Sequence, residues 1–327
     1  MLPLLGRPAV TAIQWHVFAS PPSQASSDTR AMALYPLPAV YLPGSNHVIR
    51  NVEPRNIAMC RERKEFVAAF LHPDGSRCAS VGALLQVDSV RPAARDTSCQ
   101  VLASSTPSKV LQVQCTVVGR ALIDSCQNPE QWRNPSKDQY LVANVLAYED
   151  AEGDEVLDAA SLEEVEDELF GLIDSLLDNP EEEGAIDVGA AVASLEEAAA
   201  LASAGRLWAA LDSWQVHCTT RKAAAAGLAR AERNEFLVDA KLKEGGALSI
   251  PIDERTLGLE DRAKLADLDR RAAEAAAQLG LDDVQTFQRV LESQTAAERL
   301  ALLREGVRRE ASRLARRAAL RRAYDAS

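Results

Sequence analysis

The pattern of hydrophobic and polar positions changes character once along this chain, from short runs separated by turns to long helical repeats. Residues 34–42 are rich in leucine, valine and tyrosine, which is typical of a strand half-buried on a sheet. Prolines within and just after this run lack a backbone donor, so we expect the strand at a sheet edge or a barrel rim. Pro43 and Gly44 then predict a turn, because proline presets φ and glycine tolerates positive φ.

A second strand is expected over residues 46–52, followed directly by a helix. Glu53 and Pro54 favour a helix start, because proline is tolerated in a first turn and a carboxylate there meets the positive end of the helix dipole. Arg55 can tie this helix to the sheet through its guanidinium group. We therefore expect structural roles for Glu53 and Arg55, the alternative being a substrate-binding pair.

In the second half of the chain, apolar positions recur at spacings of three and four, so the pattern predicts helices. Residues 158–177 are expected to form an amphipathic helix with an acidic outer face, begun by a capping box of Ser161 and Glu164. A second capping box at Thr295 predicts a break within the last helical block. The further helical blocks are expected at residues 194–233, as one long helix or two consecutive ones, and at 259–277 and 283–324.

Residues 36–45 and 52–56 resemble the opening motifs of the LON-type N-terminal domain of ATP-dependent Lon proteases, a domain also found in stand-alone plant and bacterial proteins. Those motifs are written loosely as P-L-x-x-V-L-F-P-G-S and F-E-P-R-Y. Their aromatic residues are replaced here, by Leu42 in the first motif and by Val52 and Asn56 in the second. Later fragments that resemble the same domain, in the same order, are residues 66–71, 79–84, 113–123 and 140–145.

The resemblance covers about residues 34–148 and implies a small PUA-like pseudobarrel, so the whole chain is expected to be α+β, with helices following the β-domain. The motif residues to which it assigns structural roles are Pro43, Gly44, Glu53, Pro54, Arg55, Gly82 and Gly119. The expected division is a leader (1–33), a LON-type β-domain (34–148), an acidic helix with a linker (149–192) and a helical region (193–327).

The resemblance implies a non-catalytic module that binds unfolded or extended polypeptide, or a protein partner, through a sheet edge and an apolar groove, with a link to protein quality control. A Lon protease needs a P-loop for ATP and a Ser-Lys dyad for cleavage, and these 327 residues contain neither. We therefore expect no enzyme activity and no cofactor. A second hypothesis is an adaptor or scaffold that acts through its C-terminal helices.

Charge is unevenly distributed along the chain, whose net charge is -12. Acidic residues crowd residues 149–187, whereas residues 299–322 hold nine arginines and two acidic residues. We expect the arginine-rich helix to pair within the chain, as a coiled-coil partner of the preceding helix or through acidic residues; the alternatives are docking to an acidic partner and a membrane-surface helix. One apolar stripe on it is formed by Leu300, Leu303, Val307, Leu314 and Leu320. A homo-oligomer formed through these helices is a further hypothesis.

The overall acidity argues against a general nucleic-acid surface, and no window is apolar enough to cross a bilayer. The six cysteines are scattered without zinc-ligand spacing, which favours free thiols in a reducing compartment and no metal site. A third hypothesis is a cysteine-dependent hydrolase, but no catalytic residue is assigned. Its candidate residues are Cys60, Cys78, Cys115 and Cys126, with His47 or His72.

The first 27 residues contain no acidic residue and end in a Ser/Pro-rich stretch. This composition fits an organellar transit peptide, a disordered leader or a misplaced start. Since stand-alone LON-type proteins of similar layout come from plants and algae, the resemblance implies a chloroplast location, with the cytoplasm as the alternative.

Overall fold

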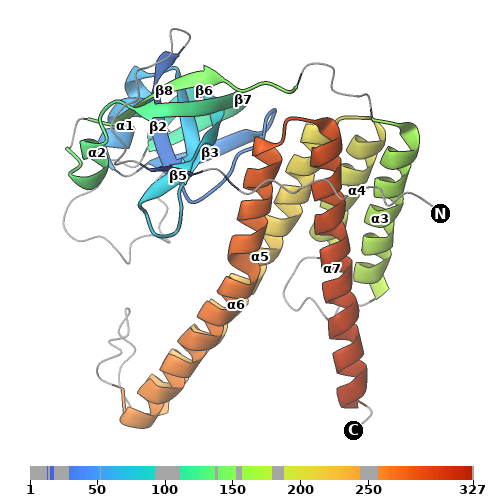
Figure 1. Ribbon diagram of the computed structural model, residues 1–327. Coiled ribbons are helices and arrows are strands. Elements are labelled where there is room, and N and C mark those ends of the chain that lie inside the picture. The colour runs from blue at the N-terminus through green and yellow to red at the C-terminus, as the bar shows by residue number, and fades with distance from the viewer. Residues whose placement is uncertain are drawn as a thin grey trace.

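A computed structural model shows a β-domain followed by a set of long helices, which confirms the α+β class expected from the sequence (Figure 1). The residues it describes are 13, 15–17, 29–51, 53–92, 111–136, 139–151, 157–178, 188–243 and 257–325. The described strands are β1 (Trp15–Val17), β2 (Arg30–Leu37), β3 (Asn46–Asn51), β4 (Glu65–Phe70), β5 (Arg77–Ala79), β6 (Val81–Pro92), β7 (Leu111–Cys126) and β8 (Leu141–Ala147). The described helices are α1 (Pro54–Glu62), α2 (Glu130–Arg133), α3 (Ala159–Asp178), α4 (Val188–Ser203), α5 (Leu207–Lys243), α6 (Leu259–Glu292) and α7 (Ala296–Asp325).

The β-domain is closed into a barrel by its longest described strand, β7. The strand order is β3-β7-β6-β4-β2-β8, and β7 also pairs with β8, so five strands form a ring. The first half of β7 carries β3, which ends the strand order and pairs with no other strand among those described. Closure removes sheet edges everywhere except at such an added strand.

The proline-containing strand β2 lies inside the barrel wall, between β4 and β8, rather than at a sheet edge. Its pairing with β8 ends at Leu34, whereas its pairing with β4 continues to Leu37. Pro36 therefore sits at the barrel rim, beyond the last residue paired with β8, where its missing donor breaks no ladder on that side. Only the end of the strand lies at the rim, because β2 begins at Arg30 and ends at Leu37, whereas the sequence predicted a strand over residues 34–42.

Two glycines of the LON-type motifs are required by backbone geometry. Gly44 has a φ of 84° in the turn that leads into β3, a conformation that favours glycine. Gly82 faces the neighbouring strand so closely that a Cβ there would lie 2.5 Å from Val67 Cγ1 and 2.7 Å from the Ala68 carbonyl oxygen. Pro54 occupies the first turn of α1, as the sequence predicts.

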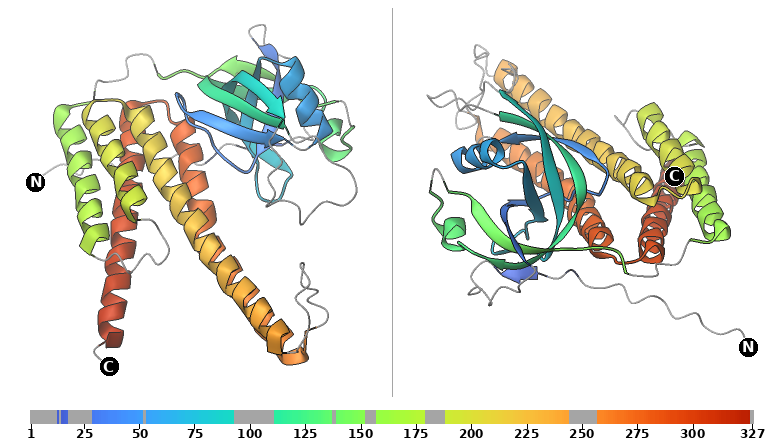
Figure 2. Two further views of the ribbon diagram at one scale, coloured as in Figure 1. Left: turned by 180° about the vertical axis from the view of Figure 1, so that it is seen from behind. Right: turned by 90° about the horizontal axis from the view of Figure 1, so that it is seen from above.

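The helices α3, α4, α5 and α7 gather in one bundle, while α5 and α6 continue as a long hairpin away from α7 (Figures 1 and 2). Of the two alternatives for residues 194–233, one long helix or two consecutive ones, the structure has two, separated at Gly205, whose φ is 69°. The gap expected between residues 277 and 283 is instead continuous helix, because a single interior glycine at 280 costs only about 1 kcal/mol. The break expected near Thr295 separates α6 from α7.

One hydrophobic core runs from the barrel into the helices and includes Leu85 and Val113 together with Leu291 and Leu303. Polar contacts reinforce this packing: the Gln288 side-chain amide donates to the Val81 carbonyl over 2.9 Å. The helical region and the β-domain are therefore packed against each other.

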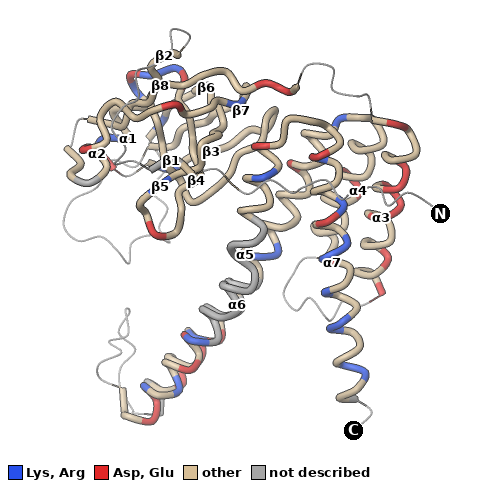
Figure 3. The backbone as a smooth tube through the Cα atoms, in the orientation of Figure 1, with Lys and Arg blue, Asp and Glu red and all other residues tan. Residues whose placement is uncertain are grey.

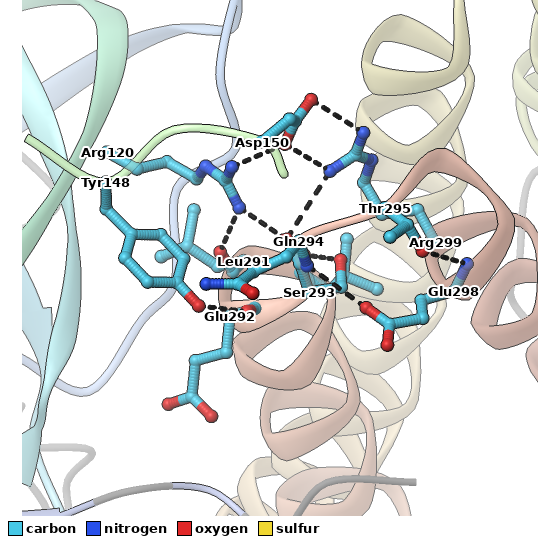
Figure 4. Close-up of polar contacts among 11 residues, drawn as sticks. Arg120, Tyr148, Asp150, Leu291, Glu292, Ser293, Gln294, Thr295, Glu298 and Arg299 are labelled. Atoms are coloured by element: carbon cyan, nitrogen blue, oxygen red, sulfur yellow. Dashed lines mark hydrogen bonds and ion pairs between the residues drawn. The ribbon is translucent and has the colours of Figure 1, made fainter. Parts of the chain in front are cut away.

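Arg120 is the polar centre of this interface (Figure 4). Its side chain extends from β7. The guanidinium donates to the carbonyls of Leu291 and Ser293 over 2.9 and 2.6 Å and pairs with Asp150. Asp150 also receives two hydrogen bonds from Arg299 of α7, at 2.7 and 2.8 Å. Both guanidiniums lie over the Trp208 ring, 5.4 and 4.7 Å from its centre. Burial lowers the pKa of Arg120, and Asp150 opposes that change.

The arginine-rich helix α7 pairs within the chain, as expected, through the acidic residues of α3. Arg304 contacts Glu164 and Glu168 at 2.7 and 3.0 Å, and Arg308 contacts Glu168 at 2.6 Å. Figure 3 shows the basic and acidic residues of the two helices along this contact. Since residue numbers rise together in these pairs, α3 and α7 run in the same direction.

The stretch assigned to a leader contains β1 and the start of β2. The backbone of β1 pairs with β5, and the Trp15 ring packs 4.7 Å from the His72 ring and 5.8 Å from the Phe70 ring, centre to centre. The other residues of this stretch, except 13 and 29, lie outside the described part of the chain. Among the described helices, none is long and apolar enough to cross a membrane.

Candidate binding pocket

A pocket of about 250 Å³ opens where the end of β2, the start of α1 and the short helix α2 meet. Its charged and polar lining residues are Tyr35, Arg50, Glu53, Arg55 and Asn56. Its apolar lining comes mainly from Leu34, Pro36, Leu37, Pro38, Leu71 and Leu141. The prolines that end the β2 ladder thus supply apolar surface at the barrel rim. A dry cavity of about 150 Å³ accepts a benzene ring, so this pocket has room for one large side chain.

Arg55 is held in place at the pocket wall. Its Nε donates to Glu53 Oε2 over 2.9 Å, and its Nη1 donates to the Gln131 carbonyl over 3.1 Å. Its guanidinium carbon lies 5.9 Å from the centre of the Trp132 ring, within the range of a cation–π contact. The arginine therefore links the start of α1 to α2, which is the structural role expected for it, and at the same time lines the pocket.

Trp132 supplies the aromatic wall of the pocket. Its indole Nε1 donates to the Gly75 carbonyl over 2.7 Å, which fixes the ring between α2 and the turn before β5. Sequence reasoning missed this residue, although a single tryptophan in the polar segment around Asn128 to Ser136 is a recognisable signal of a binding surface. Its position depends on contacts with residues about sixty positions away.

Strand β3 lies beside the pocket. Arg50 of β3 lines the pocket, and the strand has only β7 as a described neighbour, so its other side faces away from the barrel ladder. Tyr35 anchors the end of β3 to the barrel by donating to Asn51 Oδ1 over 2.6 Å. Burial, with smaller effects of nearby Cys60 and Glu53, raises the pKa of Tyr35, so its hydroxyl stays a donor at physiological pH. A terminal strand offers backbone groups to an extended peptide.

The LON-type motif residues reach the pocket only in part. Glu53 and Arg55 line it, and Pro54 lies between them at the helix start. Pro43 and Gly44 form the turn before β3, and Gly82 and Gly119 lie in β6 and β7, away from the pocket lining. A Cβ added at Gly119 would meet nothing within 4 Å, so its surroundings do not require glycine.

The described cysteines are buried, and two of them lie opposite a histidine in a strand ladder, Cys78 opposite His16 and Cys115 opposite His47. Burial raises the pKa of Cys60 to about 11 and of Cys115 to about 12, and it also raises the pKa values of Cys78 and Cys126. Such thiols stay protonated at neutral pH and are poor nucleophiles. Cys99 lies outside the described residues.

The histidines proposed as bases have other partners. His47 Nε2 lies 2.6 Å from the Ser45 hydroxyl, whose own proton points to the Leu42 carbonyl, so the imidazole is the donor in this pair. Burial lowers the pKa of His47, which keeps its ring neutral. His72 lies 2.9 Å from Asp74 and 3.0 Å from Arg77. No group of metal-ligating side chains is found among the described residues.

No protein-family model matches this chain, and no curated protein matches it. Among solved structures, the chain is similar to the Lon N-terminal domain protein from Xanthomonas campestris, with 16% identity, a TM-score of 0.29, and coverage of 41% of this chain and 72% of that one. It is also similar to the N-terminal domain of Mycobacterium avium complex Lon protease, with 14% identity, a TM-score of 0.33, and coverage of 59% and 98%. Both are domains of the type that the sequence motifs resemble.

Proposed function

We propose that the β-domain is a non-catalytic module that binds extended or unfolded polypeptide and takes one large apolar or aromatic side chain into the pocket. The observation that carries this proposal is the pocket itself, whose lining combines apolar residues at the barrel rim with Arg55 and Trp132, which lie within cation–π distance of each other. A fixed aromatic ring beside a cation offers a large contact area at low entropic cost. A role in protein quality control is consistent with such a binding preference.

The neighbouring strand β3 extends the binding surface. A side chain in the pocket positions the bound segment next to the terminal strand of the sheet, where backbone hydrogen bonds add affinity with little sequence preference. The pocket and the strand together favour a bound polypeptide that is extended rather than folded. The charges of Arg55 and Glu53 offset each other, so the lining carries one net positive charge, from Arg50, beside its apolar residues.

The test measures binding of the full chain to a fluorescent, reduced and carboxymethylated polypeptide that cannot fold. Trp132→Ala removes the aromatic wall, and Pro38→Glu places a charge at the exposed pocket mouth. Each change should weaken binding about tenfold, which corresponds to about 1.4 kcal/mol. Fluorescence anisotropy titrations give the dissociation constants.

The matched control is Pro73→Glu, because Pro73 is another exposed proline of the β-domain that does not line the pocket. It should leave the affinity unchanged. If Pro38→Glu binds as tightly as the parent chain while circular dichroism shows both to be folded, the pocket is not the binding site.

A further inference from the structure

The outer face of α3 carries an ordered stripe of acidic and large apolar residues. The stripe follows helical spacing and consists of Glu163, Asp167, Phe170, Asp174 and Leu177. It lies opposite the buried stripe of the same helix, and Phe170 and Leu177 are 45% and 55% exposed. The helix contains no lysine or arginine. An exposed stripe that mixes acidic and large apolar groups is typical of a helix contact rather than of a purely solvated face.

The end of α7 carries the complementary stripe. Leu314 is the last buried residue of this helix, and α7 then continues past the end of α3 (Figures 1 and 2). We call residues 315–325 the overhang. It contains four arginines, and its Leu320 and Tyr324 are 63% and 80% exposed. Leu320 belongs to the apolar stripe expected from the sequence, but its side chain is exposed and is not part of the core of its own chain.

The same two helices already recognise each other within one chain. Arg304 and Arg308 in the first half of α7 pair with Glu164 and Glu168 on the inward side of α3. The pairing uses arginine on α7 and carboxylates on α3, with leucines of both helices buried beside it. A partner for the overhang would therefore present carboxylates beside apolar side chains. The outer stripe of α3 presents these groups.

We propose that the overhang of α7 docks on the outer stripe of α3 in a second copy of this chain, and that the contact is reciprocal. Since α3 and α7 run in the same direction within a chain, a two-fold axis perpendicular to them brings each overhang antiparallel to the other copy's α3. With Leu320 opposite Phe170, Arg317 faces Asp174 across the contact. A two-fold pair makes this contact twice and closes the assembly as a dimer.

A second copy fits this surface better than a nucleic acid or a membrane. The overhang has four arginines on one short segment, but the rest of the chain is strongly acidic, with a net charge of -12. Such a chain is repelled by a polyanion outside the overhang itself. Its own α3 instead offers carboxylates and apolar side chains in a matching order.

The test is the mass of the full chain in solution over a wide concentration range, measured by sedimentation velocity. We expect a reversible dimer for the parent chain and a monomer for Phe170→Glu and for Leu320→Glu. Both residues are exposed in the single chain, so these changes leave folding intact. Val216→Glu, at a similarly exposed valine of α5, is the matched control and should remain dimeric.

Charge reversal tests the specific pairing. Asp174→Arg should abolish the dimer by opposing Arg317, and combining it with Arg317→Asp should restore it. Added salt should weaken the parent dimer. A parent chain that is monomeric at every concentration overturns the proposal, and so does a dimer that persists in both Phe170→Glu and Leu320→Glu.

Discussion

At the scale of single residues, two glycines that look equivalent in the sequence have different roles in the fold. Gly82 and Gly119 both belong to the LON-type fragments, and both lie in strands of the barrel. At Gly82 the backbone of β4 leaves no room for a side chain, whereas the space around Gly119 is open. Of these two glycines, the one that the barrel cannot replace is therefore Gly82, because its close neighbours include the Ala68 carbonyl, which is backbone and cannot move aside.

Gly82→Ala should lower the free energy of unfolding by about 1–3 kcal/mol, because the new methyl group overlaps Val67 and the Ala68 carbonyl. Gly119→Ala, the matched control, should be neutral or slightly stabilising, since alanine loses less entropy on folding. Urea denaturation followed by circular dichroism gives both values. Equal stability of the two variants would contradict the close-packing account of Gly82.

At the scale of elements, α7 holds the helical bundle together through charge as well as through apolar packing. Beside its contacts with α3, it places Glu310 between Arg221 of α5 and Arg313 of its own next turn. Burial alone would raise the pKa of Glu310, but the hydrogen bond from Arg313 and the charge of Arg221 outweigh it and hold the pKa below its usual range. The ionised carboxylate is thus the form that the folded bundle requires.

This arrangement predicts how stability depends on pH. Because the pKa of Glu310 is lower in the folded chain than in the unfolded one, its contribution is complete above the unfolded pKa and is lost as the pH falls through the folded pKa. Glu310→Gln should lower the free energy of unfolding by about 2–3 kcal/mol at neutral pH. It should lower it by little once the pH is below the folded pKa of Glu310. Thermal unfolding at a series of acidic pH values measures the difference.

Glu305→Gln is the matched control for this prediction, because Glu305 lies on the same helix with a side chain 44% exposed. Its effect should stay near 0.5 kcal/mol or less at all pH values. A stability difference between parent and Glu310→Gln that does not shrink as the pH falls would show that Glu310 does not act through its charge.

At the scale of the whole molecule, the junction of the two halves depends on one carboxylate. Asp150 lies between Arg120 of the barrel and Arg299 of α7, whose side chains are 5% and 4% exposed. Two buried guanidinium groups over the same indole ring need this counter-charge, because an uncompensated buried charge is strongly destabilising. The donation from the Tyr148 hydroxyl to the Glu292 carbonyl, at 2.7 Å, adds a neutral link beside it.

Asp150→Ala should lower the free energy of unfolding by about 2–4 kcal/mol, toward the lower value because Asp150 itself is 38% exposed. Since Trp208 lies under both arginines, its fluorescence should report loosening of the junction before circular dichroism reports loss of helix. Glu149→Ala, at the exposed neighbouring acid, is the control and should change little. Identical unfolding of the two variants would contradict a coupling role for Asp150.

The sequence by itself determined the features that depend on near neighbours along the chain. These include the turn at Pro43 and Gly44, the helix start at Pro54, the amphipathic acidic helix and the break near Thr295. Each is set by the φ preferences, missing donors, caps or apolar spacing of a few consecutive residues, which act whatever the rest of the chain does. The cap of the acidic helix was predicted wrongly: the helix begins at Ala159, and Asp158, not Ser161, accepts the hydrogen bond from its first turn. The opposite charges of residues 149–187 and 299–322 also predicted that these two segments attract each other.

Only the tertiary structure decided the features that depend on residues far apart in the sequence. It brought Trp132 next to Arg55 to make the pocket, chose α3 rather than α6 as the main partner of α7, and left Leu320 outside the core. It also joined Arg120 to Ser293, 173 positions away. Such contacts arise from barrel closure and helix packing, in which every element limits the positions of the others, so no local pattern specifies them.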